Sequence, residues 1–217
     1  MVEKVNEENL VKNNNNYIIY MNLLDELIEH DKKCYRELVK KELYSEFKTY
    51  NKEFKVMKEE LNKKIERVVK HISELKRNKI VILSGYPGSG KSTITNALKE
   101  NNYKVLSLDD KIKDYRDMAE KTRYYMKRRM TKNIVLDGTF LKQEQLDMFE
   151  WVRGEKGHDL IIIHIDIPMI YAYFNNIKRC LDKRNNRTYV PYGVYLSMEK
   201  SKTVIVPEKN SYVISYK

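Results

Sequence analysis

The sequence predicts an α/β fold in which a mainly parallel sheet is flanked by helices and is preceded by an all-helical extension. Two observations predict it. After residue 78, short apolar runs alternate with amphipathic stretches, which is the pattern of strands joined by helical crossovers. Before that point, residues 17–77 contain no Gly and no Pro, and this composition favours helix.

The composition fits a globular chain in three parts. With 217 residues, of which 41% are hydrophobic and 34% charged, the chain can form one medium α/β domain plus a modest appendage, and fibrous classes are excluded. Residues 1–16 are polar and rich in Asn, so we expect a disordered tail there. We expect a helical bundle or hairpin over residues 17–77 and the α/β domain over residues 78–217.

The sequence shows neither a secretory signal nor a membrane span. The most apolar segment, residues 160–174, is interrupted by His164 and Asp166 and is too short to cross a bilayer. The two cysteines, Cys34 and Cys180, lie far apart in sequence, so a disulfide framework is not expected. We therefore expect a cytoplasmic protein without membrane partners.

The extension before the α/β domain has the periodicity of amphipathic helices. One set of apolar residues recurs at steps of three and four: Phe54, Met57, Leu61, Ile65, Val68, Ile72 and Leu75. Two further apolar groups lie within residues 20–28 and 38–50, so we expect two or three helices in all. Their role stays open between a cover for one side of the sheet, a lid, a docking platform for a partner protein and an arm for homo-oligomers.

Four apolar runs predict buried strands, at residues 79–85, 103–110, 133–139 and 160–168. Because helical stretches separate them, right-handed crossovers and parallel pairing are expected. Residues 203–216 predict one or two further strands, which could form a terminal hairpin.

The stretch GYPGSGKST, residues 85–93, matches the phosphate-loop pattern G-x-x-x-x-G-K-[ST] between a strand and a helix. In this pattern backbone N–H groups and the amino end of the helix hold phosphates, the Lys reaches the β and γ phosphates, and the hydroxyl ligates Mg²⁺. ATP and Mg²⁺ are therefore the expected cofactors. The predicted nucleotide-binding residues are Gly85, Gly88, Ser89, Gly90, Lys91, Ser92 and Thr93, of which Thr93 is the one best explained as a plain helix residue.

Three aspartates follow predicted strands at the edge of the sheet that carries this loop. Asp109 and Asp110 follow the second strand, where a carboxylate can accept the proton of an attacking hydroxyl, as a kinase requires. We assign Asp109 as this general base and expect Asp110 to cap the next helix. Asp137 lies at the end of the third strand, where an acid can contact the Mg²⁺ shell or orient the acceptor.

Positive charge gathers in the part of the chain that holds the loop. Residues 78–217 carry 25 Lys and Arg against 16 Asp and Glu, which is +9 of the net +11 and suits a polyanionic substrate, although a lysine-rich solvated surface explains it equally well. Residues 111–133 add three tyrosines to nine cations, a mixture typical of surfaces that hold single strands and also of a charged amphipathic helix. In the run KRCLDKRNNR, we expect Arg179 to contact the nucleotide and Arg184 and Arg187 to stabilise the transferred phosphate.

The combination of GYPGSGKST, LDD, IVLDGT, R-x4-R-x2-R and VPYGVYLSMEKS resembles the P-loop kinase domain of phage-type polynucleotide 5'-hydroxyl kinases, over residues 79–201. The resemblance implies ATP-dependent phosphorylation of the 5'-hydroxyl end of DNA or RNA. Asp109 then matches the general base. That family usually has an Arg three residues after the base, where this chain has Ile112, so substrate contacts would fall to Lys111, Lys113 and Arg116, together with Asp137.

Two other functions are compatible with the same residues. A P-loop kinase similar to zeta toxins, or another small-molecule kinase, would carry the helical extension as a regulatory segment. A binding module without catalysis would retain the loop but would not need Asp109.

Overall fold

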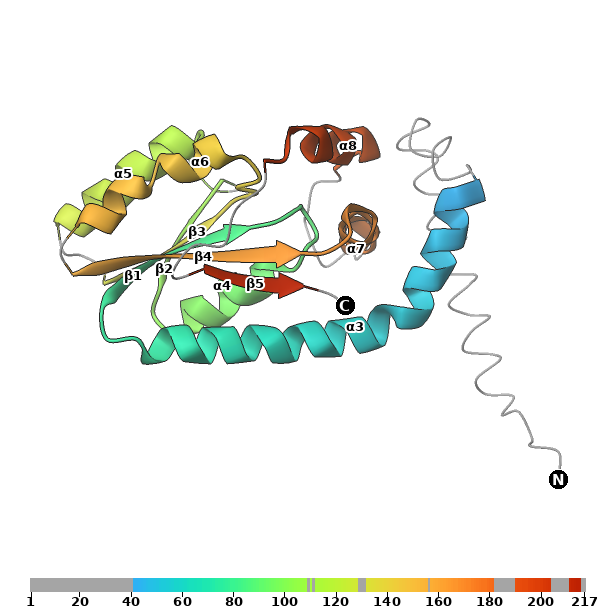
Figure 1. Cartoon of the computed structure of the whole chain (residues 1–217), viewed down its shortest axis with the longest axis horizontal. Helices are drawn as coiled ribbons and strands as arrows, with labels where there is room; N and C mark the ends of the chain where they lie inside the picture. Colours follow the sequence, from blue (N-terminus) through green and yellow to red (C-terminus); the bar gives the residue numbers. More distant parts are fainter. Residues whose placement is uncertain are drawn as a thin grey trace, which may run out of the picture. The chain divides into compact units, whose positions relative to one another are not determined.

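The computed structural model describes residues 41–108, 110, 112–128, 132–155, 157–181, 190–203 and 211–215 (Figure 1). The elements follow in the order α3 (Lys41–Glu74), β1 (Asn78–Ser84), α4 (Lys91–Glu100), β2 (Lys104–Ser107), α5 (Tyr115–Lys127), β3 (Asn133–Asp137), α6 (Gln143–Asp147), the 3-10 helix η1 (Glu150–Gly154), β4 (His158–Asp166), α7 (Met169–Leu181), α8 (Tyr192–Ser201) and β5 (Ser211–Ser215). The chain divides into two compact units, residues 1–52 and 53–217, and the whole sheet belongs to the second. The expected tail and the first part of the helical extension lie outside the described residues.

The sheet has five strands in the order β2-β3-β1-β4-β5, and every pair is parallel. This confirms the predicted α/β fold. The strand predicted after residue 203 is present as β5, which pairs in parallel with β4. The other half of the expected hairpin, residues 204–210, lies outside the described residues. In Figure 1, α4 and the part of α3 from Glu53 lie on one side of the sheet, with α5 and α6 on the other.

The central strand explains why the sheet forms at these residues. In β1 the four consecutive residues Ile80, Val81, Ile82 and Leu83 are fully buried, because helices cover both faces of the sheet. The register sets Leu83 beside Asp137 and Ser84 beside His164. Polar residues at the carboxyl ends of three neighbouring strands therefore come together at one edge.

Helix α3 is continuous from Lys41 to Glu74, so the apolar groups expected over residues 38–50 and 54–75 share one helix wherever they are described. Its buried face is formed by Leu61, Ile65, Val69 and Ile72, whereas Val68, which the periodicity had placed there, is only half-buried. The side chains of Phe54 and Met57 lie outside the described part. Lys64 Nζ donates to Ser215 O at 2.7 Å, and the His71 ring contacts the Tyr212 ring edge-on. The helix is therefore tied to the edge strand β5. Of the helices that the structure describes, none combines the length and apolar content needed to cross a lipid bilayer.

Candidate nucleotide-binding site

A cleft of about 880 Å³ lies at the carboxyl edge of the sheet. Its walls come from the phosphate loop, α4, the ends of β2 and β3, and α7. The residues that line it are Pro87, Gly88, Lys91, Ser92, Thr95, Asn96, Lys99, Val105, Ser107, Leu108, Asp110, Asp137, Gly138, Thr139, Asn176, Arg179 and Val190. The fold thus brings most of the predicted motifs to one cavity.

The phosphate loop needs glycine for two different reasons. Gly85, Gly88 and Gly90 have φ values of +148°, +79° and +106°, a backbone region that residues with a side chain rarely adopt. At Gly88, a Cβ atom would also lie 2.2 Å from the carbonyl oxygen of Ala172 in α7. The loop is therefore packed tightly against α7, and α4 starts directly after it with Gly90 as its N-cap.

Lys91, at the first position of α4, is held within the loop. Its side chain is buried, and Nζ donates to the carbonyl oxygens of Gly85 and Tyr86, both at 2.7 Å. Gly85 N in turn donates to Thr139 O at 2.9 Å, which joins the loop to the segment after β3. Ser89, the remaining residue of the predicted cradle, is fully buried. The ammonium group is therefore held against the carbonyl groups of the loop at the amino end of α4.

Oxygen atoms suited to Mg²⁺ face the cleft beside this lysine. Ser92 Oγ lies 3.5 Å from Arg179 Nη2, and Asp137 Oδ2 accepts a hydrogen bond from Thr95 Oγ1 at 3.0 Å. Mg²⁺ is usually held by one or two such protein oxygens together with phosphates and water, so this pair fits the ion. In the described part of the chain, no three His, Cys, Asp or Glu side chains gather as a metal-ligand group. Thr95 was not predicted, since nothing in the sequence marks a helical Thr as a partner of a strand-end acid.

The end of β2 forms another part of the cleft wall. The strand ends at Ser107, earlier than expected, and Asp110 N donates to Ser107 O at 3.1 Å in a tight turn. Leu108 and Asp110 both line the cleft, while Asp109 lies outside the described residues. The turn therefore brings the segment that carries the predicted general base to the cavity of the phosphate loop.

The prediction that Asp110 caps the following helix is wrong. Helix α5 begins at Tyr115, and its cap is Asp114, whose carboxylate accepts from Asp117 N at 2.8 Å. The physical reason is Ile112, which is buried in the core against α5, so the chain must first turn inward and only then start the helix. A buried isoleucine also explains why no cation occupies that position.

The other predicted substrate residues differ in where they lie. Lys113 and Arg116 are exposed and do not line the cleft, and Lys111 lies outside the described residues. Tyr115 is closer to the cleft, because its hydroxyl lies 2.8 Å from Thr139 Oγ1. Helix α5 thus starts beside the cleft wall and runs away from it.

The basic run after β4 is only partly described. Arg179 lines the cleft from α7, whereas Arg184 and Arg187 lie outside the described residues. Asn176, which the sequence did not single out, is buried and accepts a hydrogen bond from Val190 N at 3.1 Å. This contact brings the chain back to the cleft after the basic run.

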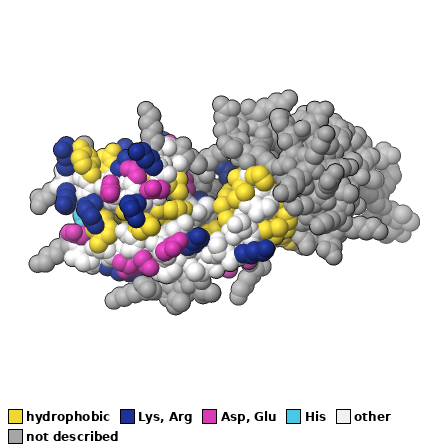
Figure 2. All heavy atoms as spheres, turned by 90° about the horizontal axis from the view of Figure 1, so that it is seen from above, with side chains coloured by type: hydrophobic (Ala, Val, Ile, Leu, Met, Phe, Trp, Pro, Cys, Tyr) yellow, Lys and Arg dark blue, Asp and Glu magenta, His cyan; other side chains and the backbone are white. Residues whose placement is uncertain are grey.

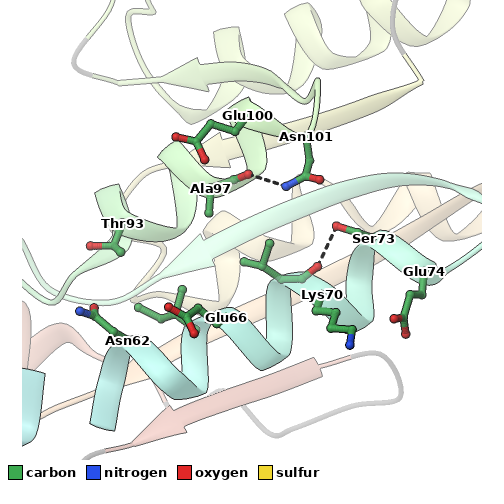
Figure 3. Close-up of a pocket in the computed structure, with 11 residues that line it drawn as sticks. Asn62, Glu66, Lys70, Ser73, Glu74, Thr93, Ala97, Glu100 and Asn101 are labelled. Carbon is green, nitrogen blue, oxygen red and sulfur yellow. Dashed lines mark hydrogen bonds between the residues drawn. The ribbon is translucent and has the colours of Figure 1, made fainter. Parts of the chain in front are cut away.

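Thr93 faces away from the cleft. It is exposed and lines a second hollow, of about 690 Å³, between α3 and α4 (Figure 3). Asn62 and Glu66 reach this groove from α3, and Asn101 lies at its other end (Figure 3). The side chain of Thr93 is therefore a helix-surface residue in this structure.

A polar network lies under the loop at the ends of β1 and β4. Ser84 Oγ donates to Phe140 O at 2.8 Å, so it accepts from His164 Nδ1 at 2.9 Å. Burial is the main cause that lowers the pKa of His164, and the nearby ammonium of Lys202 lowers it further, against the opposing effect of Asp166. The imidazole is therefore neutral at pH 7, with its proton on Nδ1.

The outer surface near α5 carries cations stacked on aromatic rings. Arg128 Cζ lies 4.5 Å from the centre of the Tyr124 ring, and Tyr124 is 47% exposed. On the same helix, the Tyr125 ring is covered by Lys104 Nζ at 5.4 Å. Figure 2 shows Lys and Arg side chains beside hydrophobic ones, with acidic ones among them, over the end of the molecule that holds α5 and α6. The interleaving of cationic and aromatic side chains expected from the sequence is thus present, and acidic side chains lie among them.

Three comparisons relate the chain to known proteins. A family model described as an AAA domain matches residues 80–202. A search of curated protein sequences found no match. Similar solved structures include a gluconokinase from Sinorhizobium meliloti 1021, with 13% identity over 65% of this chain and 84% of that chain and a TM-score of 0.45. A fungal RNA kinase has 18% identity over 64% of this chain and 74% of that chain, with a TM-score of 0.44.

A putative kinase from Chloroflexus aurantiacus j-10-fl has 12% identity over 64% of this chain and 89% of that chain, with a TM-score of 0.45. Likeness at this level does not distinguish substrates. The family match is more informative, because it extends from β1 through the phosphate loop to the end of α8 and covers more than half of the chain. The chain belongs to the AAA domain family, with the phosphate loop of a P-loop nucleotide-binding protein.

Proposed function

We propose that the protein is an ATP-dependent P-loop kinase that transfers the γ-phosphate to the 5'-hydroxyl end of DNA or RNA. The observation that carries the proposal is that the phosphate loop and the turn over residues 107–110 line the same cleft. A kinase must hold a phosphate donor and a proton-accepting group beside one space, and a cleft shared by the phosphate loop and the residues that flank Asp109 in the sequence supports this proposal.

The donor side uses residues of the loop and of α4. Lys91, the first residue of α4, would hold the β and γ phosphates, and the amino end of that helix adds partial positive charge. Ser92 and Asp137 would hold Mg²⁺, which neutralises charge on the phosphates when bound. Thr95 would keep the Asp137 carboxylate in place.

The acceptor side uses the turn after β2. Leu108 and Asp110, the described residues on either side of the predicted general base in the sequence, both line the cleft. Asp109 would take the proton of that hydroxyl as its oxygen forms a bond to the γ phosphorus and the bond to the β-phosphate oxygen breaks. Arg179 at the cleft, and Arg184 and Arg187 after it, would offset charge on the transferred group.

Charge and aromatic rings support a polynucleotide acceptor over a small sugar. Helix α5 starts beside Thr139 at the cleft wall and carries exposed cations and the exposed Tyr124. Cations pair with phosphates and exposed rings stack on bases, which suits the nucleotides that follow a 5' end. A sugar acid would make no use of this surface.

The test is transfer of labelled γ-phosphate from Mg-ATP to defined acceptors by the full chain. The acceptors are a 5'-hydroxyl RNA oligonucleotide, its DNA counterpart, the same oligonucleotides already carrying a 5' phosphate, gluconate and a nucleotide sugar. We expect label only on the 5'-hydroxyl oligonucleotides, at the terminal nucleotide after nuclease digestion. Label on gluconate or on the nucleotide sugar, with none on either oligonucleotide, would contradict the proposed acceptor.

Two variants separate catalysis from binding. Asp109→Asn should lower transfer by about 100-fold or more while ATP binding persists, because only the proton acceptor is lost. Asp147→Asn is the matched control, since Asp147 is an exposed carboxylate at the end of α6 outside the cleft. Full transfer by Asp109→Asn would favour the binding-module function, or a different base.

A further inference from the structure

Two side chains from outside the phosphate loop hold consecutive carbonyl groups of the loop. Tyr195 of α8 donates its hydroxyl hydrogen to Pro87 O at 2.8 Å. Asn175 of α7 donates from Nδ2 to Gly88 O at 3.0 Å. Together with the two carbonyls held by the lysine of the loop, four successive carbonyl groups, at residues 85–88, accept hydrogen bonds from side chains.

The geometry of the peptide bond gives these contacts a consequence for the cleft. In a planar trans peptide, the carbonyl oxygen and the following N–H point in opposite directions, and none of the described peptides is cis. The bond from Tyr195 to Pro87 O therefore sets the direction of the Gly88 N–H. The bond from Asn175 to Gly88 O does the same for Ser89, whose N–H donates to Tyr86 O at 3.1 Å and closes the turn.

The Tyr195 hydroxyl is placed by packing, so that it can act as a fixed donor. Its side chain is fully buried, and its ring contacts the rings of Tyr173 at 5.4 Å and Tyr86 at 6.3 Å between centroids. For packing alone a phenylalanine would serve as well, since these ring contacts do not involve the hydroxyl. The polar atom is needed only for hydrogen bonding, and Pro87 O is its acceptor.

We propose that Tyr195 and Asn175 are positioning residues that hold the phosphate loop in its phosphate-binding shape: Tyr195 directs the Gly88 N–H toward bound phosphate, and Asn175 holds the peptide whose Ser89 N–H closes the turn. This gives a role to α8, because no residue of that helix is among those that line the cleft. The inference rests on the proposed use of the loop to hold a polyphosphate, and it does not depend on the acceptor.

The test measures binding of inorganic tripolyphosphate, ADP and adenosine to the full chain by calorimetry or competition, without any acceptor. Tyr195→Phe removes only the hydroxyl. We expect it to weaken tripolyphosphate and ADP binding about fivefold, as for loss of one hydrogen bond, while adenosine binding is unchanged. Asn175→Ala should give the same selective loss, with the melting temperature close to that of the wild type.

Tyr103→Phe is the matched control. Tyr103 is also buried, it precedes β2 at the opposite end of the strand from the cleft, and its hydroxyl makes no hydrogen bond within the described structure. This variant should bind all three ligands as the wild type does. A purely structural role for the Tyr195 hydroxyl predicts instead a lower melting temperature and equal losses for adenosine and ADP.

The outcomes are distinct. Wild-type affinity of Tyr195→Phe for tripolyphosphate, or an equal loss in Tyr103→Phe, would overturn the inference. If the wild type binds tripolyphosphate but phosphorylates no 5'-hydroxyl end, the proposed acceptor fails and the positioning role stands. If the wild type binds neither ADP nor tripolyphosphate, both proposals fail.

Discussion

The hydroxyl oxygen of Thr95 lies 3.0 Å from Asp137 Oδ2 and 3.1 Å from Lys91 O, so it joins the first turns of α4 to the end of β3. Groups that orient a metal-holding carboxylate typically change metal affinity by tenfold or more when removed. Thr95→Val keeps the shape of the side chain and removes the hydroxyl. We expect the Mg²⁺ concentration for half-maximal phosphate transfer to rise about tenfold, measured by magnesium titration at saturating ATP.

Thr122→Val is the control for that variant. Thr122 is equally buried in a helix, but its hydroxyl donates only to Met118 O within α5. Its magnesium dependence should match the wild type. An unchanged magnesium dependence in Thr95→Val would show that Asp137 needs no support from Thr95, or that it does not hold the ion.

Gly88→Ala should disable the phosphate loop. A methyl group there would overlap Ala172 O at 2.2 Å, and the backbone φ of +79° disfavours a side chain. Relieving the overlap must displace the loop by a sizeable fraction of an ångström, and a displacement of that size can cost about 100-fold in rate. The measurement is the initial rate of transfer together with ADP affinity.

Gly193→Ala makes the same chemical change where it should be harmless. A methyl group at Gly193, in α8, would meet no atom within 4 Å. Because alanine favours helix over glycine by about 1 kcal/mol, this variant should keep its activity and unfold at equal or higher urea concentration. Equal loss of activity in both variants would contradict a specific role for the Gly88 geometry.

Leu61→Ala should destabilise the unit that holds the sheet. Leu61 in α3 is only 6% exposed, and its Cδ2 lies 3.3 Å from the position of a methyl group at Gly90, so the helix supports the phosphate loop from behind. Loss of a buried leucine costs about 2–4 kcal/mol, which urea unfolding measures. Val56→Ala, on the same helix but 60% exposed, should change stability by no more than about 0.5 kcal/mol. If both variants unfold alike, α3 is not part of this core.

His164 should make the protein less stable in mild acid. Its folded pKa lies below that of an unfolded histidine, because of burial, Lys202 and Lys91, with Asp166 acting in the opposite direction. Below about pH 6.5 the unfolded chain therefore binds more protons than the folded one, and stability falls as pH falls.

His164→Asn tests this by removing the titration while keeping an amide donor near Ser84 Oγ. We expect the free energy of unfolding, measured in urea between pH 7.5 and 5, to fall less steeply in the variant than in the wild type. Parallel curves would mean that His164 titrates alike in both states. Among the described histidines, His158 is the other partly buried one, and it is present in both proteins and cancels in the comparison.

Local sequence information predicted the elements well where one pattern dominated. The apolar run before GYPGSGKST gave β1 to within a residue, because a strand buried on both faces must be continuously apolar. The steps of three and four in α3 predicted a helix, but periodicity could not decide between the adjacent Val68 and Val69. That choice depends on how the helix is rotated against its neighbours, and the structure buries Val69.

The residues of the candidate site likewise divide into those that the sequence identified and those that it did not. Lys91, Ser92 and Asp137 were identified because their spacing and strand-end positions carry the chemistry, and the fold does bring them to one cleft. Tyr195 lies within VPYGVYLSMEKS, a motif that contributes to the family resemblance but whose residues the sequence alone gave no function. Asn175 had no sequence signal at all, since its partner is a backbone atom 87 positions away.

By itself, the sequence determined the alternating strands and helices, the parallel sheet and the phosphate loop, because each follows from residues close together in the chain. The tertiary structure alone decided which side chains hold the loop in shape. Tyr195 donates a hydrogen bond to Pro87 O, which is 108 positions away in the sequence, and Leu61 of α3 lies behind Gly90. Contacts of that kind depend on how separate elements pack, and the distances between packed elements cannot be derived from local residue spacing or composition.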